Sequence, residues 1–241
     1  TETGEYVFQH FLTATQQVEA LIGYVQRKLN IGIFSVLYPQ DDYGLEMVSI
    51  FRSKVKSIGG KIYQAVPYRK TDTDFSNQIR KLTGNRIGVA EQASGMDEST
   101  HTRLSVDFEA LFIPDSHQRV KMITSQLAYY NVMGVKLLGT SLWHSPDLVK
   151  NGAEYLEGAV FVDSFFANGY LPETNDFVDV YYAAYGREPG NIDALSYDTM
   201  DIVLKVLEKQ KIKTRDEFLE ALLNVRGFRG ATGNVSFNGK R

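Results

Sequence analysis

The stretch VLYPQDDYGLEMVSIF (residues 36–51) places the end of a strand, a polar turn and an amphipathic helix in immediate succession. The apolar run 31–37 has the length of a buried strand. After the acidic turn, Tyr43 and Gly44 open a segment whose apolar side chains recur at near-helical spacing, namely Leu45, Val48, Phe51 and Val55. Gly59 and Gly60 end that segment, as glycines commonly end helices. The pattern predicts a strand that passes directly into a helix.

The same alternation of strand and helix continues along most of the chain. Apolar runs predict further strands at 61–68, 108–113, 135–138 and 159–161, and apolar periodicity predicts helices from about 116, at 173–185 and at 191–208. Thr214 and Glu217 have the spacing of a capping box, which predicts another helix start, and 228–237 reads as a turn and a strand. The polar segment 84–106 is predicted to be a surface excursion. Repeated strand–helix–strand units predict an α/β fold with parallel sheets flanked by helices.

The composition is that of a globular protein with no bias toward nucleic acid. Apolar residues make up 43% and charged residues 23% of the 241 residues, and the net charge of −3 argues against a nucleic-acid-binding surface. No apolar run approaches the roughly 20 residues of a membrane span. The chain has no cysteine, which excludes disulfides, thiolate metal sites and cysteine nucleophiles.

Tyr43 is the first candidate binding residue because of its position. In open parallel sheets, ligands lie beyond the carboxyl ends of the strands, where strand passes to helix. A tyrosine there offers a flat apolar face and a hydroxyl, and Gly44 beside it allows close approach of a backbone or a ligand. The alternative is that Tyr43 only packs over the edge of the sheet.

Patterns that would indicate catalysis, a metal or a cofactor are weak in this sequence. The histidines at 10, 101, 117 and 144 have no metal-ligand spacing. Ser53 and Lys56 formally match S-x-x-K, but they fall inside an amphipathic helix and lack the companion motifs. Asp72 and Asp74 begin like a calcium loop without its glycine and terminal glutamate. We therefore expect a protein that is not an enzyme and has no cofactor or metal site.

The order of these motifs resembles a known family. Residues 36–82, with the tyrosine–glycine pair opening a helix and the glycine pair after it, are similar to the second lobe of type I periplasmic binding proteins, the leucine/isoleucine/valine-binding family. FEALFIPDSHQRVKMITSQL (108–127) and VKLLGTSLW (135–143) resemble the next two units, and NIDALSYDTMDIVLKVLE (191–208) resembles the return helix. The details around 112–148 and 159–166 look closer to a branch of that family, the lipoproteins that activate penicillin-binding proteins.

The resemblance implies two lobes, of which the first is incomplete. It assigns residues 29–165 plus 226–241 to a complete α/β lobe two, and residues 1–28 plus 166–225 to the later part of lobe one. Family members begin with further strand–helix units before a segment like EYVFQHFLTATQQ (5–17). We therefore expect the chain to be a piece of a longer protein, with the alternative that the missing half is supplied from elsewhere.

The resemblance also implies ligand-binding residues, which would lie at Tyr43, at Pro114 and Asp115, and at Ser141. Ser141 stands where amino-acid-binding relatives have an acid, so a free α-amino acid is a doubtful ligand unless Asp115 supplies the charge. Asp115 also has the sequence context of a helix N-cap. Trp143, the only tryptophan, follows at the same strand end, where its ring could stack on a ligand or anchor strand to helix.

The function implied is extracytoplasmic binding of a small molecule, an amino acid or another small polar compound, by closure of the two lobes. For transport, the partner would be a membrane permease, and the location would be the periplasm or cell envelope, with a lipid anchor as one option in the full-length protein. One alternative is an interaction domain, like the penicillin-binding protein activators, that contacts a cell-wall synthase. A further alternative is the sensing domain of a membrane receptor. No nucleic-acid partner is expected.

Overall fold

The computed structural model describes residues 6–84, 86, 104–209 and 212–237, so most of the predicted excursion at 84–106 lies outside the described residues. The chain divides into two compact units, one formed by residues 13–163 (unit 2) and the other by 1–12 with 164–241 (unit 1). None of the described helices is long and apolar enough to cross a membrane.

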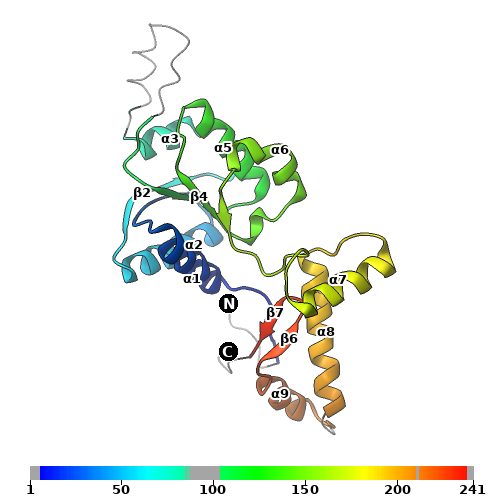
Figure 1. Ribbon diagram of the computed structural model, residues 1–241. Helices are drawn as coiled ribbons and strands as arrows, with labels where there is room; N and C mark the ends of the chain where they lie inside the picture. Colours follow the sequence, from blue (N-terminus) through cyan, green and yellow to red (C-terminus); the bar gives the residue numbers. More distant parts are fainter. Residues whose placement is uncertain (1–5, 85, 87–103, 210–211, 238–241) are drawn as a thin grey trace. The chain divides into compact units, whose positions relative to one another are not determined.

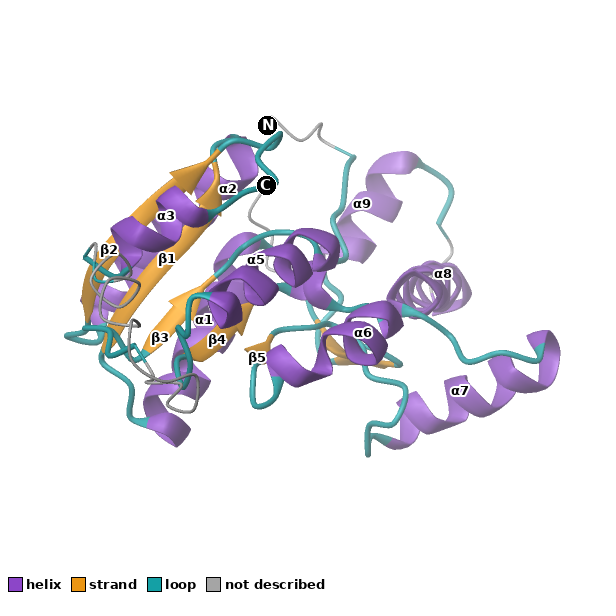
Figure 2. Ribbon diagram, turned by 90° about the horizontal axis from the view of Figure 1, so that it is seen from above, coloured by secondary structure: helices purple, strands orange, loops and turns teal. Residues whose placement is uncertain are grey.

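Unit 2 is built on a parallel sheet with the strand order β2-β1-β3-β4-β5. Figures 1 and 2 show its helices arranged around these strands. The strands are β1 (Ile33–Pro39), β2 (Lys61–Tyr68), β3 (Ala110–Phe112), β4 (Lys136–Gly139) and β5 (Val160–Phe161). The helices are α1 (Ala14–Tyr24, extended by a π-helical turn, Val25–Leu29), α2 (Asp42–Ser57), α3 (Ser76–Leu82), α5 (His117–Tyr129) and α6 (Pro146–Leu156).

Alternate strand residues face two different hydrophobic clusters. Phe34, Val36 and Phe112 join the cluster that also contains the buried faces of α1 and α2. Leu111 and Ile113 join the cluster that contains apolar side chains of α3, α5 and α6. Both faces of the sheet are therefore covered by helices, as the α/β prediction requires.

Unit 1 contains, within its described residues, three helices and a two-stranded antiparallel sheet. The helices are α7 (Pro172–Tyr185), α8 (Asn191–Lys209) and α9 (Arg215–Leu223), and the sheet pairs β6 (Phe228–Gly230) with β7 (Gly233–Val235). The capping box predicted at Thr214 and Glu217 is confirmed, because the Thr214 hydroxyl accepts from the Glu217 amide and the Glu217 carboxylate accepts from the Thr214 amide. The segment read as a turn and a strand is a complete hairpin.

The boundaries expected for the two lobes differ from those of the two units. Residues 226–241 were assigned to lobe two, yet the described part of that segment lies in unit 1, where Phe228 and Val235 pack in one cluster with Ile202 and Val206 of α8. Residues 13–28 were assigned to lobe one, yet α1 packs in unit 2 because its apolar face is buried in the cluster shared with α2. These two boundaries are corrected accordingly.

The Asp198 carboxylate of α8 explains why the hairpin belongs to unit 1. Its side chain is fully buried and accepts hydrogen bonds from the backbone amides of Ala231 (2.7 Å) and Thr232 (2.8 Å) and from the Thr232 hydroxyl (2.6 Å). A side chain at Gly230 would come within 2.5 Å of that carboxylate. The hairpin turn is thus fixed to the helix by polar contacts as well as by apolar packing.

Candidate functional site: the carboxyl edge of the unit 2 sheet

The first turn of α2 lies at the carboxyl edge of the unit 2 sheet, immediately after β1. The Asp41 carboxylate caps this helix by accepting from the Gly44 amide at 2.7 Å. The helix can start so close to the strand only because residue 44 is glycine, since a Cβ there would lie 2.0 Å from the carbonyl oxygen of Pro39. Gly44 therefore accommodates the chain's own backbone, and this fixes the position of Tyr43.

The Tyr43 hydroxyl donates a hydrogen bond to the hydroxyl oxygen of Thr140 at 3.1 Å. Thr140 follows β4, and β3 lies between β1 and β4 in the sheet. The half-buried Tyr43 therefore reaches across the end of β3 and links the carboxyl ends of β1 and β4. Burial raises the pKa of the Tyr43 phenol despite the opposing effect of the Thr140 hydrogen bond, so the hydroxyl stays protonated at neutral pH.

Ser141 follows Thr140 and begins a short 3₁₀ turn, Ser141–Trp143. Its backbone amide donates to the side-chain oxygen of Gln17 in α1 at 3.1 Å, and Ser141 itself is half-buried. The structure therefore brings Ser141 to the same strand tip as the hydrogen bond between Tyr43 and Thr140. The turn is held to α1 through the nearly buried Gln17.

Asp115 follows β3 and is contacted by the last residue of β2. Its carboxylate accepts from the Tyr68 hydroxyl at 2.5 Å and from the Ser116 amide at 2.6 Å. The helix that follows begins with Ser116 as its N-cap, so Asp115 is not the N-cap residue. Burial and the neighbouring Asp115 carboxylate both raise the pKa of Tyr68, which keeps the phenol a donor toward Asp115.

Trp143 lies inside the hydrophobic core instead of lining the edge. Its ring is 1% exposed, its indole N–H donates to the carbonyl oxygen of Ile113 at 3.0 Å, and it packs in the cluster of α3 and α5. Gly139 makes room for it, because a Cβ at that position would lie 2.2 Å from the ring. The expectation that the Trp143 ring presents a face to a ligand is corrected, and its role is that of the anchor given as the alternative.

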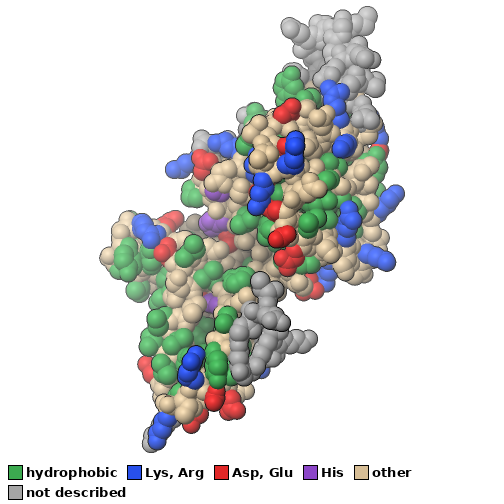
Figure 3. Space-filling model, turned by 180° about the vertical axis from the view of Figure 1, so that it is seen from behind, with side chains coloured by type: hydrophobic (Ala, Val, Ile, Leu, Met, Phe, Trp, Pro, Cys, Tyr) green, Lys and Arg blue, Asp and Glu red, His purple; other side chains and the backbone are tan. Residues whose placement is uncertain are grey.

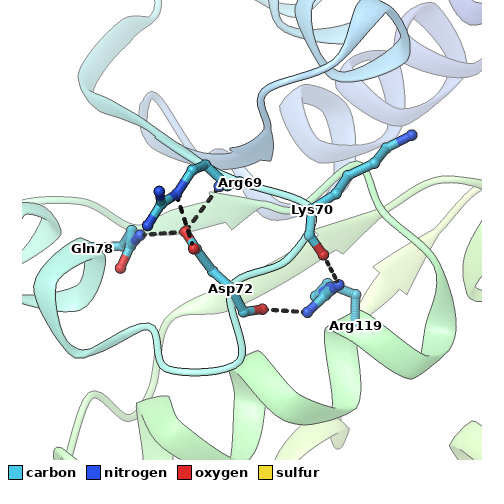
Figure 4. Close-up of polar contacts among 5 residues, drawn as sticks. All are labelled: Arg69, Lys70, Asp72, Gln78 and Arg119. Atoms are coloured by element: carbon cyan, nitrogen blue, oxygen red, sulfur yellow. Dashed lines mark hydrogen bonds and ion pairs between the residues drawn. The ribbon is translucent and has the colours of Figure 1, made fainter.

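Polar contacts hold the loop after β2 at the same edge. The Arg119 guanidinium of α5 donates to the backbone carbonyl oxygens of Lys70 and Asp72 (Figure 4). The Asp72 carboxylate in turn accepts from the Arg69 backbone amide at 2.9 Å and from the Gln78 side chain at 3.3 Å. These contacts fix the loop that carries Lys70.

The Lys70 side chain points away from Arg119 in Figure 4 and pairs with the Asp41 carboxylate at 2.7 Å. Burial acts to raise the pKa of Asp41, but the Lys70 ammonium and the Gly44 amide outweigh it and leave the pKa below its ordinary value. The edge therefore carries a charged pair beside the two tyrosines. Among the described residues there is no cluster of three or more histidine or acidic side chains that could hold a metal ion.

Several residues of this edge were missed by the sequence reasoning, namely Gln17, Tyr68, Lys70 and Thr140. Tyr68 and Thr140 lie at strand ends, so the rule that singled out Tyr43 would have found them as well. Gln17 could not have been found that way, because it comes from a helix that precedes the first strand.

Comparison with known proteins agrees with this fold. A family model described as periplasmic binding protein matches residues 1–241. A leucine-binding protein from Thermotoga maritima shares 23% identity with a TM-score of 0.74, and the alignment covers 98% of this chain and 61% of that one. The branched-chain amino acid transporter substrate-binding protein from Streptococcus pneumoniae, solved with isoleucine, shares 23% identity with a TM-score of 0.72 and the same coverage.

A solute-binding protein of an ABC transporter from Rhodopseudomonas palustris, solved with benzoate, shares 16% identity with a TM-score of 0.71, covering 98% of this chain and 59% of that one. The chain thus spans about three fifths of the length of these structures. A comparison with curated proteins found no match. The expected type I periplasmic-binding-protein fold is confirmed, and the chain belongs to the periplasmic binding protein family.

Proposed function

We propose that the carboxyl edge of the unit 2 sheet is one wall of a solute-binding site that serves an ABC transporter. The observation that carries this proposal is the half-buried Tyr43, whose phenol spans the end of β3 to reach Thr140 and leaves Ser141 beside it. Family membership supports it, because similar structures are substrate-binding proteins solved with isoleucine, leucine or benzoate. The protein would act by binding and not by catalysis, outside the cytoplasm.

The solute would contact the Tyr43 ring and polar groups of Ser141 and Asp115. Asp115 already accepts hydrogen bonds from Tyr68 and Ser116 within the protein, and Ser141 supplies no second carboxylate for an ammonium group. This favours a small polar compound without an obligatory ammonium over a free α-amino acid. Trp143 would contribute by holding the Ser141 turn in place, because its buried ring anchors that turn to β3.

The test is isothermal titration calorimetry of the native protein against leucine, isoleucine, benzoate and small amides. We expect Tyr43→Ala to weaken the binding of the responding compound at least about tenfold, which corresponds to about 1.4 kcal/mol. Tyr129→Ala is the matched control, because Tyr129 is a highly exposed tyrosine at the far end of α5, where that helix runs back from the edge.

Equal affinity of the Tyr43→Ala variant and the parent would contradict the site. Binding of benzoate or an amide without binding of leucine would support the preference argued from Asp115, and the reverse would contradict that preference alone. If the folded native protein binds none of the compounds, the result would favour the interaction-domain and receptor alternatives over solute transport.

A further inference from the structure

Basic side chains gather where helices α1 and α2 end in unit 2. Each helix is followed by a strand after a short connection, residues 30–32 before β1 and residues 58–60 before β2. The carboxyl-terminal ends of both helices therefore lie at the amino edge of the sheet, opposite the edge that carries Tyr43. We call the basic residues at these helix ends, together with the first residue of β2, the basic edge: Arg27, Lys28, Arg52, Lys54, Lys56 and Lys61.

Few acidic side chains offset the charge of the basic edge. Glu19 of α1 pairs with Lys54 at 3.0 Å. The Glu109 carboxylate accepts hydrogen bonds from the backbone amides of Gly32 (2.8 Å) and Ile33 (2.9 Å). Within the described residues, the other five members of the basic edge form no ion pair, and residues 47–71 include no aspartate or glutamate. The edge therefore keeps a local positive charge in a chain whose net charge is −3.

The helix dipoles account for only part of this arrangement. Basic side chains in the last turn of a helix interact favourably with the negative end of its dipole. Lys54 and Lys56 lie in the last turn of α2, and Arg27 and Lys28 lie in the π-helical turn that ends α1. Arg52 lies before the last turn of α2, and Lys61 begins a strand, so neither is explained in this way.

Partly exposed apolar side chains lie at the same edge. Tyr24, the last residue of α1, is 43% exposed, and Ile33, the first residue of β1, is 39% exposed. Ile33 is the direct neighbour of Lys61 in the pairing of β1 with β2. Figure 3 shows several Lys and Arg side chains on the side of unit 2 that α2 and β2 form. Basic residues combined with an exposed tyrosine and an aliphatic side chain are typical of surfaces that contact lipid headgroups.

We propose that the basic edge binds the surface of a membrane that contains anionic phospholipid. The ammonium and guanidinium groups would pair with headgroup phosphates, and Tyr24 would lie at the level of the headgroups. The net charge of −3 opposes approach to an anionic surface, so binding depends on the local charge of this edge. The candidate solute site lies at the opposite ends of the same strands, so it stays free when the basic edge is occupied.

Vesicle sedimentation tests this proposal with the 241-residue chain. At about 50 mM sodium chloride, we expect the protein to bind vesicles of phosphatidylcholine with about 30% phosphatidylglycerol at least about tenfold more tightly than vesicles of phosphatidylcholine alone. This preference should fall as sodium chloride rises to about 300 mM, because salt screens the interactions of exposed charges. Equal binding to both kinds of vesicle, or binding to neither, would overturn the proposal.

Substitution of three lysines locates the binding surface. Lys28→Gln, Lys56→Gln and Lys61→Gln together should weaken binding to the phosphatidylglycerol vesicles at least about tenfold, because each lysine near an anionic surface contributes to binding. The control variant changes the net charge equally by removing three exposed basic residues of other segments: Lys150→Gln, Lys213→Gln and Arg229→Gln. It should bind within about threefold of the parent, and equal weakening by both triple variants would overturn the proposal.

Lysine acetylation measures the contact in the unaltered chain, so this readout does not depend on the folding of a variant. With phosphatidylglycerol vesicles present, Lys56 and Lys61 should be acetylated at least about threefold more slowly than in the free protein, as measured by peptide mass spectrometry. Lys150 and Lys213 should react at the same rate with and without vesicles. Protection of the basic edge by polyglutamate but not by vesicles would assign it to an acidic protein partner and would overturn the proposal.

Discussion

The hydroxyl of Ser35 is fully buried in the middle of β1 and has no hydrogen-bond partner among the described residues. A buried polar group without a partner costs about 1–3 kcal/mol of folding free energy. Thr83 is the contrasting case, because its hydroxyl is equally buried but donates to the carbonyl oxygen of Ile79 at 3.0 Å. The two hydroxyls are alike in burial and differ in whether they have a hydrogen-bond partner.

We therefore expect Ser35→Ala to raise the free energy of unfolding by about 1 kcal/mol, because it removes the unsatisfied group. Thr83→Val should lower it, because the valine keeps the shape and loses the hydrogen bond. Urea denaturation monitored by circular dichroism measures both changes. A destabilised Ser35→Ala variant would show that the hydroxyl has a partner.

At the level of elements, the start of α2 determines where Tyr43 lies. Asp41 caps this helix and pairs with Lys70, so Asp41→Ala should cost about 1 kcal/mol of stability at neutral pH. Because the pKa of Asp41 is lowered in the folded protein, its ionised form stabilises the fold above the ordinary pKa, and this contribution is lost as the pH falls below it. The difference between variant and parent should shrink between about pH 5 and pH 2 in urea unfolding. A difference that stays constant over that range would contradict the role of the charge.

The connection between α7 and α8 is held by a second carboxylate. Asp193 accepts from the Arg187 guanidinium at 3.0 Å and from the Gly190 amide at 2.8 Å, and these contacts lower its pKa to about 2. Its stabilising effect is therefore complete above the ordinary pKa of an aspartate and is lost as the pH falls toward about 2. We expect Asp193→Asn to flatten the pH dependence of unfolding in that window. Backbone amide shifts of residues 186–194, followed by NMR, should report a midpoint near pH 2 in the parent, and a midpoint near 4 would contradict the assigned contacts.

The strands and helices were predictable where the apolar pattern repeated over many residues. The strand at 61–68 and the helix opening at Tyr43 are found nearly as expected, because each buries a regular face. The hairpin was read as a turn and a strand because each of its strands has only three residues, too few to show a period. The orientation of Trp143 was not predictable, because a residue at a strand tip can turn toward the core or away from it, and the space left by Gly139 decides this.

At the scale of the whole molecule, the two units differ in how completely they bury their apolar surfaces. The unit 2 sheet has helices on both faces and two large hydrophobic clusters. The described clusters of unit 1 are smaller, and α8 leaves several apolar side chains about half exposed, namely Tyr197, Met200, Leu204 and Leu207. The lobe boundaries could not be read from sequence order, because the partner of α1 and the partner of the hairpin are set by three-dimensional packing.

This difference predicts that residues 13–163 fold as an isolated chain, whereas residues 164–241 do not. A covered sheet with two cores buries enough apolar surface to offset the loss of chain entropy. The helices and short hairpin described within residues 164–241, with half-exposed apolar side chains on α8, bury too little. The shorter piece should show little near-ultraviolet circular dichroism and no cooperative urea transition, while residues 13–163 should unfold in a single transition. Cooperative unfolding of residues 164–241 alone would contradict this prediction, because it would mean that these residues are stable with the exposed apolar side chains of α8 in water.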